Sequence, residues 1–559
     1  MTTSITKLSP RAAFITSCVL VALCYLNSLP NDFIFDDGPT VVSNPAIRTI
    51  SPIKFLHSPY WATQGYEGFY RPFTIFSLSV DYAIWKRWAA GFRLTNLALH
   101  ATNGFLLFLL CTSLVGEGIV PLAAMLIYVA HPIHTEAVTS IVGRSDLFST
   151  CFLLTAWLLF RRGHTLWPTV LFALALLSKE NAIVFPAILI LEFLIRGGAD
   201  GTNSTDRLSL RRLAVMIAVA VGYLALRLSV LGRLGVPASA QYMGGQLTYI
   251  ERLMTSGRVF LECMKLLFTP INVAGDYDFN AIPVANLTSW DAWVGLVLIA
   301  GIVLGAFLYK RRNWVISFGI LFAFLVYVPV SNWIMPISVL MAERFLYLPL
   351  IGLSLVAAVL FSKIREWRLQ RLIGVGALVT ATVLCISHNY TRRNDFTFFG
   401  NMVRVEPNSA KARLGYGYAL LGAGFKDDAA RQFEAGLRII PDSADLLTTL
   451  ALTKMTTTGC NDAWPLLKRA LQINPSRGDT RRRMGDCFFK EGKIQEAESM
   501  YREAVHNIPY PDSLLYIMWG RSLEATGQGQ SAITAYERAA LIDPDNVFIK
   551  QKLSALRSE

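Results

Sequence analysis

Long apolar runs separated by short polar segments dominate the chain as far as about residue 390. A helix that crosses a membrane needs about 20 mainly apolar residues, and about eleven runs reach or approach that length. Because the runs follow one another closely, they predict a bundle of membrane-spanning helices. The expected spans lie near residues 12–29, 92–115, 118–131, 146–160, 165–178, 181–196, 211–231, 289–309, 314–331, 345–362 and 371–388.

Beyond residue 390 the apolar positions recur at helical spacing, and prolines mark a regular period. Prolines at positions 407, 441, 475, 509 and 544 stand 34, 34, 34 and 35 residues apart. This is the period of the tetratricopeptide repeat (TPR), in which small residues let two helices pack closely and a proline ends the second helix. The register is kept by Gly417, Gly424, Ala429 and Phe433 in repeat one, Ala451, Ala463 and Leu467 in a degenerate repeat two, Gly485, Gly492, Ala497 and Tyr501 in repeat three, and Gly520, Gly527, Ala532 and Tyr536 in repeat four.

These two patterns predict an all-α protein with two parts. Residues 1–390 form a polytopic membrane bundle with large outer loops at 30–90 and 232–288, and residues 391–406 form a linker or half-repeat. Residues 407–559 hold about four TPRs and a polar capping helix, which the exposed end of a solenoid requires. Such a solenoid commonly holds an extended polypeptide in its concave face, and self-association is the alternative use.

Composition and charge add a direction to this picture. With 53% hydrophobic residues and a mean hydropathy of +0.42, the chain is too apolar for an ordinary soluble protein. The net charge of +13 does not indicate a nucleic-acid partner, because the basic residues gather in short clusters between apolar runs, as in cytoplasmic loops. A cytoplasmic amino terminus and about eleven spans put every such cluster inside. The TPR part then faces the periplasm or the lumen of the endoplasmic reticulum.

The eight cysteines contain no CxxC pair, and six of them lie in or beside apolar runs. This distribution predicts neither a zinc site nor a disulfide framework. Cys460 and Cys487 fall in different repeats and can pair only if the fold brings them together.

Carboxylates stand directly after the first span, on the side opposite the basic clusters. Asp36 and Asp37 are adjacent there. At the lipid boundary, burial and mutual repulsion raise the pKa of one member of such a pair and suit it to act as a base. A solvated loop pair is the plainer interpretation of two neighbouring aspartates.

Further polar residues mark the other outer turns. His131, His134, Glu136 and Asp146 surround one turn, where their spacing suits either a metal ion or a hydrogen-bonded turn. Lys179 with Glu180, and Glu343 with Arg344, lie at the ends of spans, where ion pairs commonly have structural roles. The long outer loop adds Asp276 and Asp278. A divalent metal is possible at these carboxylates but not favoured, and no cofactor is firmly implied.

Six segments occur along the chain in a characteristic order: Phe35-Asp36-Asp37, Tyr70-Arg71-Pro72, His131 to Val138, Gly143 to Leu147, Lys179-Glu180 and Ala342 to Pro349. The most specific of them are the HPxHTE and AERxLYLP stretches. Together they resemble a known family, the transmembrane-and-TPR-containing (TMTC) protein O-mannosyltransferases, and the resemblance covers essentially the whole chain.

The family is similar to the GT-C glycosyltransferases, which take a sugar from a polyprenyl-phosphate carrier on the non-cytoplasmic face. The resemblance implies that Asp36 or Asp37 activates the acceptor hydroxyl, while cations hold the carrier phosphate as it leaves. It favours Arg344 and Arg144 for that role, with Arg71, Lys179 and Arg93 as further candidates. The implied donor is a polyprenyl-phosphate sugar, mannose by likeness, and the implied acceptor is Ser or Thr of a protein held by the TPR part.

Two other classes compete with this interpretation. A TPR receptor or scaffold for an envelope complex needs the membrane part only as an anchor. A transporter needs ionisable residues within its spans, whereas the charges here gather at the outer ends. Convergence of the outer carboxylates and arginines on one cleft favours the enzyme, and scattered positions favour the scaffold.

Overall fold

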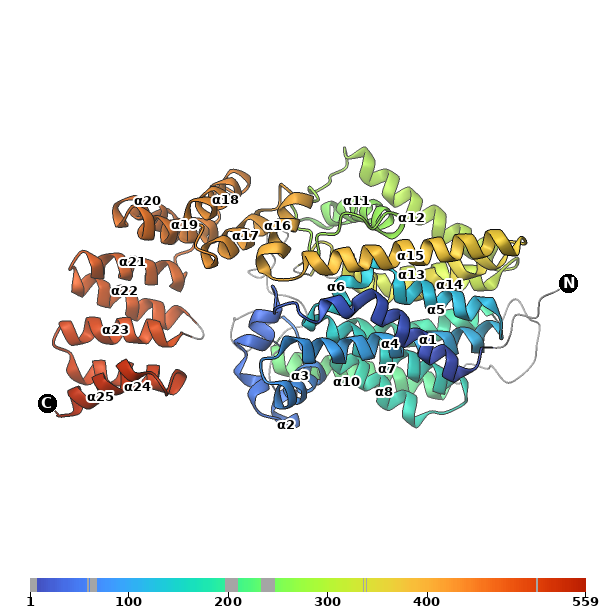
Figure 1. Cartoon of the computed structure of the whole chain (residues 1–559), viewed down its shortest axis with the longest axis horizontal. Coiled ribbons are helices and arrows are strands. Elements are labelled where there is room, and N and C mark those ends of the chain that lie inside the picture. The colour runs from blue at the N-terminus through green and yellow to red at the C-terminus, as the bar shows by residue number, and fades with distance from the viewer. Residues whose placement is uncertain are drawn as a thin grey trace. The chain divides into compact units, whose positions relative to one another are not determined.

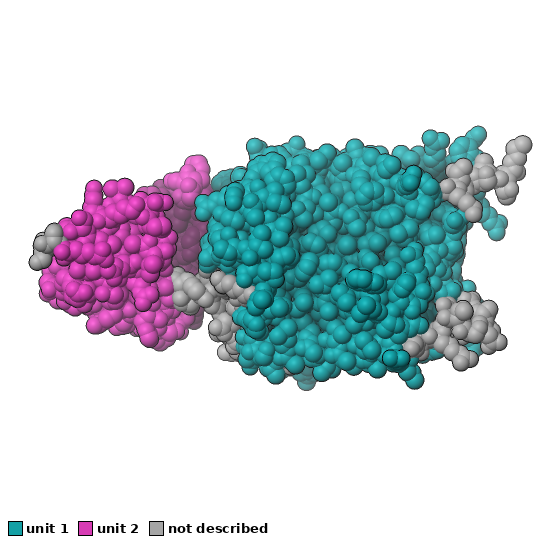
Figure 2. Space-filling view, turned by 90° about the horizontal axis from the view of Figure 1, so that it is seen from below, with its two compact units in different colours: residues 1–62, 66–406 teal, residues 63–65, 407–559 magenta. Residues whose placement is uncertain are grey.

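The computed structural model describes residues 8–57, 60, 68–196, 210–232, 247–334, 336–337, 339–508 and 511–558. Parts of both predicted outer loops (58–59, 61–67 and 233–246) and Pro509 lie outside the described residues. The chain divides into two compact units, Met1–Ala62 with Tyr66–Glu406 and Thr63–Gly65 with Pro407–Glu559 (Figure 2). The described residues form helices and no strand, with one isolated bridge between Tyr277 and Met341, so the predicted all-α class is confirmed.

The first unit is a bundle of helices of unequal length (Figure 1). Its helices are α1 (Pro10–Tyr25), α2 (Pro52–Leu56), α3 (Pro72–Trp85), α4 (Ala89–Val115), α5 (Ile119–Ala130), α6 (Thr135–Thr139), α7 (Arg144–Arg161), α8 (Leu166–Ser178), α9 (Phe185–Arg196), α10 (Leu210–Leu231), α11 (Tyr249–Phe268), α12 (Trp290–Tyr309), α13 (Trp314–Tyr327), α14 (Pro349–Ser362), α15 (Trp367–Thr391) and α16 (Asp395–Val405). Short 3-10 turns connect several of them, including η4 (Pro132–His134), η6 (Glu180–Val184), η8 (Val328–Val330) and η9 (Glu343–Leu346).

Among the described residues, five helices are long and apolar enough to cross a membrane, and the protein is an integral membrane protein. They are α4, α10, α12, α15 and α1 extended by the turn that follows it. A sixth candidate is the pair formed by α5 and residues Pro132–Thr139, which bends by 48° at a break. The apolar helices α8, α13 and α14 are shorter, and the runs predicted at 146–160 and 181–196 form α7 and α9. The count of about eleven spans stays a prediction.

The first and last long helices of this unit are tied together by amide side chains. Asn27 donates to the carbonyl of Ile386 at 3.0 Å, and Asn31 donates to the carbonyl of Asn389 at 2.9 Å. Asn389 returns a bond to the carbonyl of Cys24 at 2.9 Å. The segment that follows α1 therefore has its position set by α15.

Helix α11 lies within the region predicted as the large outer loop 232–288. Its first turn is closed by a capping box of Thr248 and Glu251. Glycines let it approach α12 closely, since a methyl group at Gly257 or Gly295 would collide with the backbone of the opposite helix. Close packing of α11 against α12 fixes which face of α11 is left for α9 and α13.

The second unit is a solenoid of helical hairpins, as the proline period predicts (Figure 1). The pairs are α17 (Ala410–Gly422) with α18 (Lys426–Ile439), α19 (Ala444–Thr457) with α20 (Cys460–Ile473), α21 (Gly478–Lys490) with α22 (Ile494–Asn507), and α23 (Ser513–Ala525) with α24 (Gly529–Ile542), followed by α25 (Val547–Ser558). Residues 391–406, predicted to be a linker or half-repeat, form the end of α15 and helix α16, which belong to the first unit.

The regular spacing of small and aromatic residues in the solenoid has a direct steric cause. In three hairpins a glycine of the first helix lies against an aromatic ring of the second, and any side chain at Gly417, Gly485 or Gly520 would overlap that ring. Repeat two has Ala451 and Leu467 at the corresponding positions, both buried. It therefore lacks the ring contact that fixes the two helices of the other repeats.

Candidate active site

The acidic loop, the segment after α1 that carries Asp36 and Asp37, is held in place by several hydrogen bonds. The carboxylate of Asp37 is fully buried and accepts the backbone N–H of Ile34 at 3.4 Å and of Val142 at 3.1 Å. Arg93, near the start of α4, donates to the carbonyl of Thr139 at 3.0 Å and to the carbonyls of Asn31 and Asp32. The loop is thus held between α4 and the segment that follows α6.

Helix α16 holds the other side of the loop. Phe35 has a positive φ of 49°, which is uncommon for a residue with a side chain. Its N–H donates to the carboxylate of Asp395 at 2.8 Å, and its ring contacts those of Phe398 and Phe399. These contacts maintain a strained backbone next to the two aspartates, as is common at functional sites.

The two aspartates differ in their surroundings. Burial raises the pKa of Asp37 to about 6, against the opposing influence of Arg93 and two backbone hydrogen bonds, and the charge of Asp36 adds to the increase. Asp36 is half-buried. Asp37 therefore holds the loop through its buried hydrogen bonds, whereas Asp36 is more accessible to a reacting group.

Four predicted cations are each paired with a carboxylate. Arg71 makes two bonds to Glu180, at 2.9 and 2.7 Å, and Lys179 lies 2.6 Å from both carboxylate oxygens of Asp146. Burial alone would raise the pKa of Glu180, but Arg71 outweighs it and holds the pKa well below the ordinary value.

Arg144 is completely buried and pairs with Asp81 at 2.6 Å. It also donates to the side chain of Asn96 at 3.0 Å and to the carbonyl of Phe92 at 2.7 Å. Together with Arg93, which donates to three carbonyls, it joins the helices around the acidic loop. The donors of both residues are directed at protein acceptors.

Two distant motifs meet at Arg344. Its backbone N–H donates to Glu136 at 2.7 Å, and its guanidinium forms an ion pair with the same carboxylate. Burial opposes the charge of Arg344, but Glu136 and Asp276 outweigh it and raise its pKa, with a further contribution from Asp36. The carboxylates of Asp36, Glu136 and Asp276 therefore share the electrostatic neighbourhood of one guanidinium.

The neighbouring Glu343 organises the long outer loop. It accepts the N–H of Gly275 at 2.9 Å, the hydroxyl of Tyr277 at 3.0 Å and the guanidinium of Arg392 at 3.1 Å. Asp278 closes the turn that follows, accepting the N–H groups of two residues just beyond it at 3.0 and 2.8 Å.

The two histidines of the HPxHTE turn face structural partners. His131 accepts the N–H of Ile133 at 3.3 Å, and its Nε2 lies 3.1 Å from the carbonyl of Leu267. His134 is buried among the rings of Tyr128 and Tyr347. The described part of the chain contains no group of three or more His, Cys, Asp or Glu side chains arranged to hold a metal ion.

An apolar cavity of about 440 Å³ lies among α9, α11, α12 and α13. Its walls are side chains such as Leu191, Phe260 and Leu325, and a narrow recess adjoins it at the loop after α13. Ser256, Val259 and Ser331 line both spaces, and the recess adds Arg252, Thr255 and Asn332. A membrane protein with a cavity of this kind can accommodate the apolar part of a lipid.

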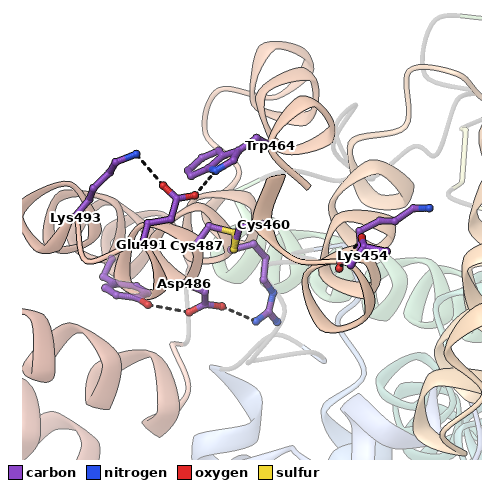
Figure 3. Close-up of a disulfide and its surroundings, with 10 residues drawn as sticks. Lys454, Cys460, Trp464, Asp486, Cys487, Glu491 and Lys493 are labelled. Atoms are coloured by element: carbon purple, nitrogen blue, oxygen red, sulfur yellow. Dashed lines mark hydrogen bonds and ion pairs between the residues drawn. A yellow bond between two sulfur atoms is a disulfide. The ribbon is translucent and has the colours of Figure 1, made fainter. Parts of the chain in front are cut away.

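The solenoid contains a disulfide between Cys460 and Cys487, whose Cα atoms are 5.6 Å apart (Figure 3). It joins the start of α20 to α21, across the boundary of repeats two and three. The sequence predicts no disulfide framework and leaves this pair dependent on the fold; the solenoid brings the two residues together although they are 27 positions apart. Trp464 and Lys493 both bond to Glu491 beside it, at 2.6 and 2.8 Å.

Sequence reasoning missed several residues of the site. Asp81 and Arg392 neutralise predicted residues, yet each lies within or at the end of an apolar helix and carries no local motif. Asp395 falls in the segment predicted as a linker. Polar residues at the ends of apolar helices are the signal that could have found Arg392 and Asp395, whereas Asp81 lies within α3.

These features define a polytopic α-helical membrane protein with a buried acidic loop and a TPR solenoid, and similar curated proteins carry the name expected from the motifs. No family model matches the chain. The chain is 25% identical over 441 residues to protein O-mannosyl-transferase F38B6.6 of Caenorhabditis elegans, covering 75% of this chain and 61% of that protein. It is 24% identical over 608 residues to human protein O-mannosyl-transferase TMTC3, covering 97% and 65%. The inferred resemblance is confirmed.

The chain thus spans somewhat less than two thirds of the length of these relatives. Human protein O-mannosyl-transferase TMTC4 gives the same picture, with 24% identity over 477 residues, 74% of this chain and 64% of the relative. Among solved structures, similarity extends to TPR proteins. The thermophilic TPR protein TTC0263 of Thermus thermophilus shares 15% identity over 34% of this chain and 99% of its own, at a TM-score of 0.26. The TPR protein YrrB shares 21% identity over 32% and 85%, at a TM-score of 0.23.

Proposed function

We propose that this protein is an inverting glycosyltransferase that moves a sugar, mannose by similarity to its relatives, from a polyprenyl-phosphate carrier to Ser or Thr of a protein on the non-cytoplasmic face. The observation that carries the proposal is the acidic loop, in which Asp36 stands half-buried near Arg344 on a backbone held from three sides. Rigid placement of a base is what hydroxyl activation requires.

The chemistry assigns different roles to the two aspartates. Asp36 takes the proton of the acceptor hydroxyl, whose oxygen forms a bond to the anomeric carbon from the face opposite the carrier. The bond between that carbon and the phosphate oxygen breaks, and its electron pair leaves with the polyprenyl phosphate. Asp37 positions Asp36 through Ile34 and Val142, and Arg344 stabilises charge on the reacting groups.

The carrier fits the membrane unit. A polyprenyl chain is wholly apolar, and the cavity among α9, α11, α12 and α13 offers an apolar volume of about 440 Å³. This volume falls within the range of about 300–1,000 Å³ typical of ligand sites in proteins.

The disulfide of the solenoid supports a location outside the cytoplasm. Disulfides persist in oxidising compartments such as the periplasm and the endoplasmic reticulum. With the amino terminus in the cytoplasm, the solenoid and the acidic loop share that outer compartment, and the solenoid presents the protein acceptor. A reporter fused at the carboxyl terminus should be active outside the cytoplasm, and one fused after Arg312 inside it. A cytoplasmic carboxyl terminus would refute this arrangement.

The activity is tested with purified protein and a panel of polyprenyl-phosphate sugars that differ in the sugar and in chain length. Transfer of one labelled sugar to Ser or Thr of a protein acceptor, with inverted anomeric configuration, is the expected result. A retained configuration, or transfer from a soluble nucleotide sugar alone, would contradict the mechanism. Absence of transfer from every donor would favour the rival hypothesis of a TPR scaffold anchored in the membrane.

A further inference from the structure

Arg252 has a buried guanidinium nitrogen, Nε, without a hydrogen-bond partner. It lies in the first turn of α11 and lines the narrow recess that adjoins the apolar cavity. Its guanidinium lies over the ring of Tyr249, 5.7 Å from the ring centroid. A buried guanidinium donor without an acceptor is costly, so this arrangement calls for an anion.

The comparison with the predicted phosphate-binding cations strengthens this argument. Arg71, Arg144, Lys179 and Arg344 each form an ion pair with a carboxylate of the chain itself. Across the ranges that the structure describes, Arg252 forms none. A phosphate that approaches Arg252 gains a charge-assisted bond without displacing an internal partner, whereas the paired cations must first give up theirs.

The surroundings of Arg252 fit an amphiphilic ligand. Ser256 and Ser331 line both the recess that holds Arg252 and the cavity, so the two spaces adjoin. Asn332, which has a positive φ of 62°, shapes the wall of the recess by accepting the N–H of Ile337 at 2.8 Å and donating to the carbonyl of Val339 at 3.2 Å. The result is a narrow recess in which Arg252, Thr255 and Asn332 stand among apolar side chains, and which adjoins the apolar cavity.

We propose that Arg252 binds the phosphate of a polyprenyl-phosphate lipid whose first isoprene units lie in the cavity among α9, α11, α12 and α13. The proposal rests on the proposed function for the identity of the lipid and deepens it by naming the residue that recognises the phosphate. The adjoining cavity distinguishes this ligand from a free phosphate, which has no apolar part to bury. Arg252 is a positioning residue, since the reacting carbon is held by other groups.

The test measures binding of a polyprenyl phosphate and of the polyprenol of equal length to the full-length protein in nanodiscs. Arg252→Gln should weaken binding of the phosphate about ten- to hundredfold, because a charge-assisted hydrogen bond is lost, and should leave binding of the alcohol unchanged. Arg252→Lys, which keeps the charge but loses the planar fork, should fall between the two. Lys265→Gln is the matched control, because Lys265 lies on the same helix but is 63% exposed.

Equal preference for phosphate over alcohol in wild type and Arg252→Gln would overturn the proposal. So would equal weakening by Lys265→Gln, since a general loss of positive charge would then explain the effect. A phosphate preference that an anionic phospholipid competes away completely would assign the site to bulk lipid and overturn it as well. If binding depends on Arg252 but no sugar is transferred, the inference stands and the proposed function fails. If sugar is transferred with an unchanged KM for the donor in Arg252→Gln, the proposed function stands and the inference about Arg252 fails.

Discussion

Replacing Asp37 with asparagine should separate the loop-holding role of this residue from catalysis. In the folded protein burial raises the pKa of Asp37 from 3.8 to about 6. A difference of about two units corresponds to about 3 kcal/mol by which the ionised form disfavours folding at neutral pH. The folded state binds the proton of Asp37 more tightly than the unfolded state does. Protonation of Asp37 therefore stabilises the fold fully below pH 3.8, and this stabilisation is lost as the pH rises through about 6.

Asparagine removes that cost but also removes one acceptor. Either Ile34 or Val142 then keeps an N–H without a partner, at a cost of about 1–3 kcal/mol. The two changes nearly cancel at neutral pH, so Asp37→Asn should be about as stable as the wild type there. Between pH 5 and pH 7, however, the wild type should lose about 1 kcal/mol relative to the variant.

Unfolding in detergent, followed at several pH values for both proteins, measures this difference directly. Only the difference between wild type and variant is used, so titration of other carboxylates cancels. In parallel, transfer activity of Asp37→Asn should fall, because the loop that carries Asp36 loses one of the two backbone hydrogen bonds accepted by Asp37. A stability difference that stays constant from pH 5 to pH 7 would refute the reasoning, since it would mean that Asp37 does not titrate near 6.

Three further changes test the division of labour in the chain. Asp36→Asn should lower transfer by about 10²–10⁴ without shifting the unfolding midpoint, and turnover near that of the wild type would remove Asp36 from the mechanism. The double variant Cys460→Ser, Cys487→Ser should destabilise the solenoid by about 3 kcal/mol, measured as protease sensitivity of the full chain, with Cys18→Ser as control. Truncation after Glu406 should abolish capture of protein acceptors but keep hydrolysis of the donor, whereas truncation after Arg393 should lose both activities. Loss of donor hydrolysis in both truncated proteins would place the solenoid in the active site.

The solenoid was predictable because its determinants are local. Gly417, Gly485 and Gly520 each meet an aromatic ring 16 residues later in the same hairpin, so one repeat period specifies the contact. The membrane helices were predictable as apolar runs, but their number was not. Helices such as α9 and α13 are shorter than a full span, and length alone does not separate a tilted or broken span from a re-entrant segment.

The site was predictable only as a set of residues. Motifs located Asp36, Glu136 and Arg344, but pairing them required the fold, because Glu136 and Arg344 are 208 positions apart. The sequence also could not show that Arg144 is neutralised by Asp81, or that Cys460 lies beside Cys487. Partners of this kind depend on which helices become neighbours, and periodicity contains no information on that.

The acidic loop is among the first segments synthesised, yet several of the groups that hold it lie about 360 residues later in the chain. Asn31 is bound by Asn389, the N–H of Asp32 by the carbonyl of Arg393, and Phe35 by Asp395, at separations of about 360 residues. During translation the loop therefore lacks these contacts until α15 and α16 have left the ribosome. On the proposed function, an incomplete chain in the membrane should not consume donor, and two fragments that divide the first unit should regain activity only when they reassemble. The order of synthesis would then delay activity until the first unit is complete.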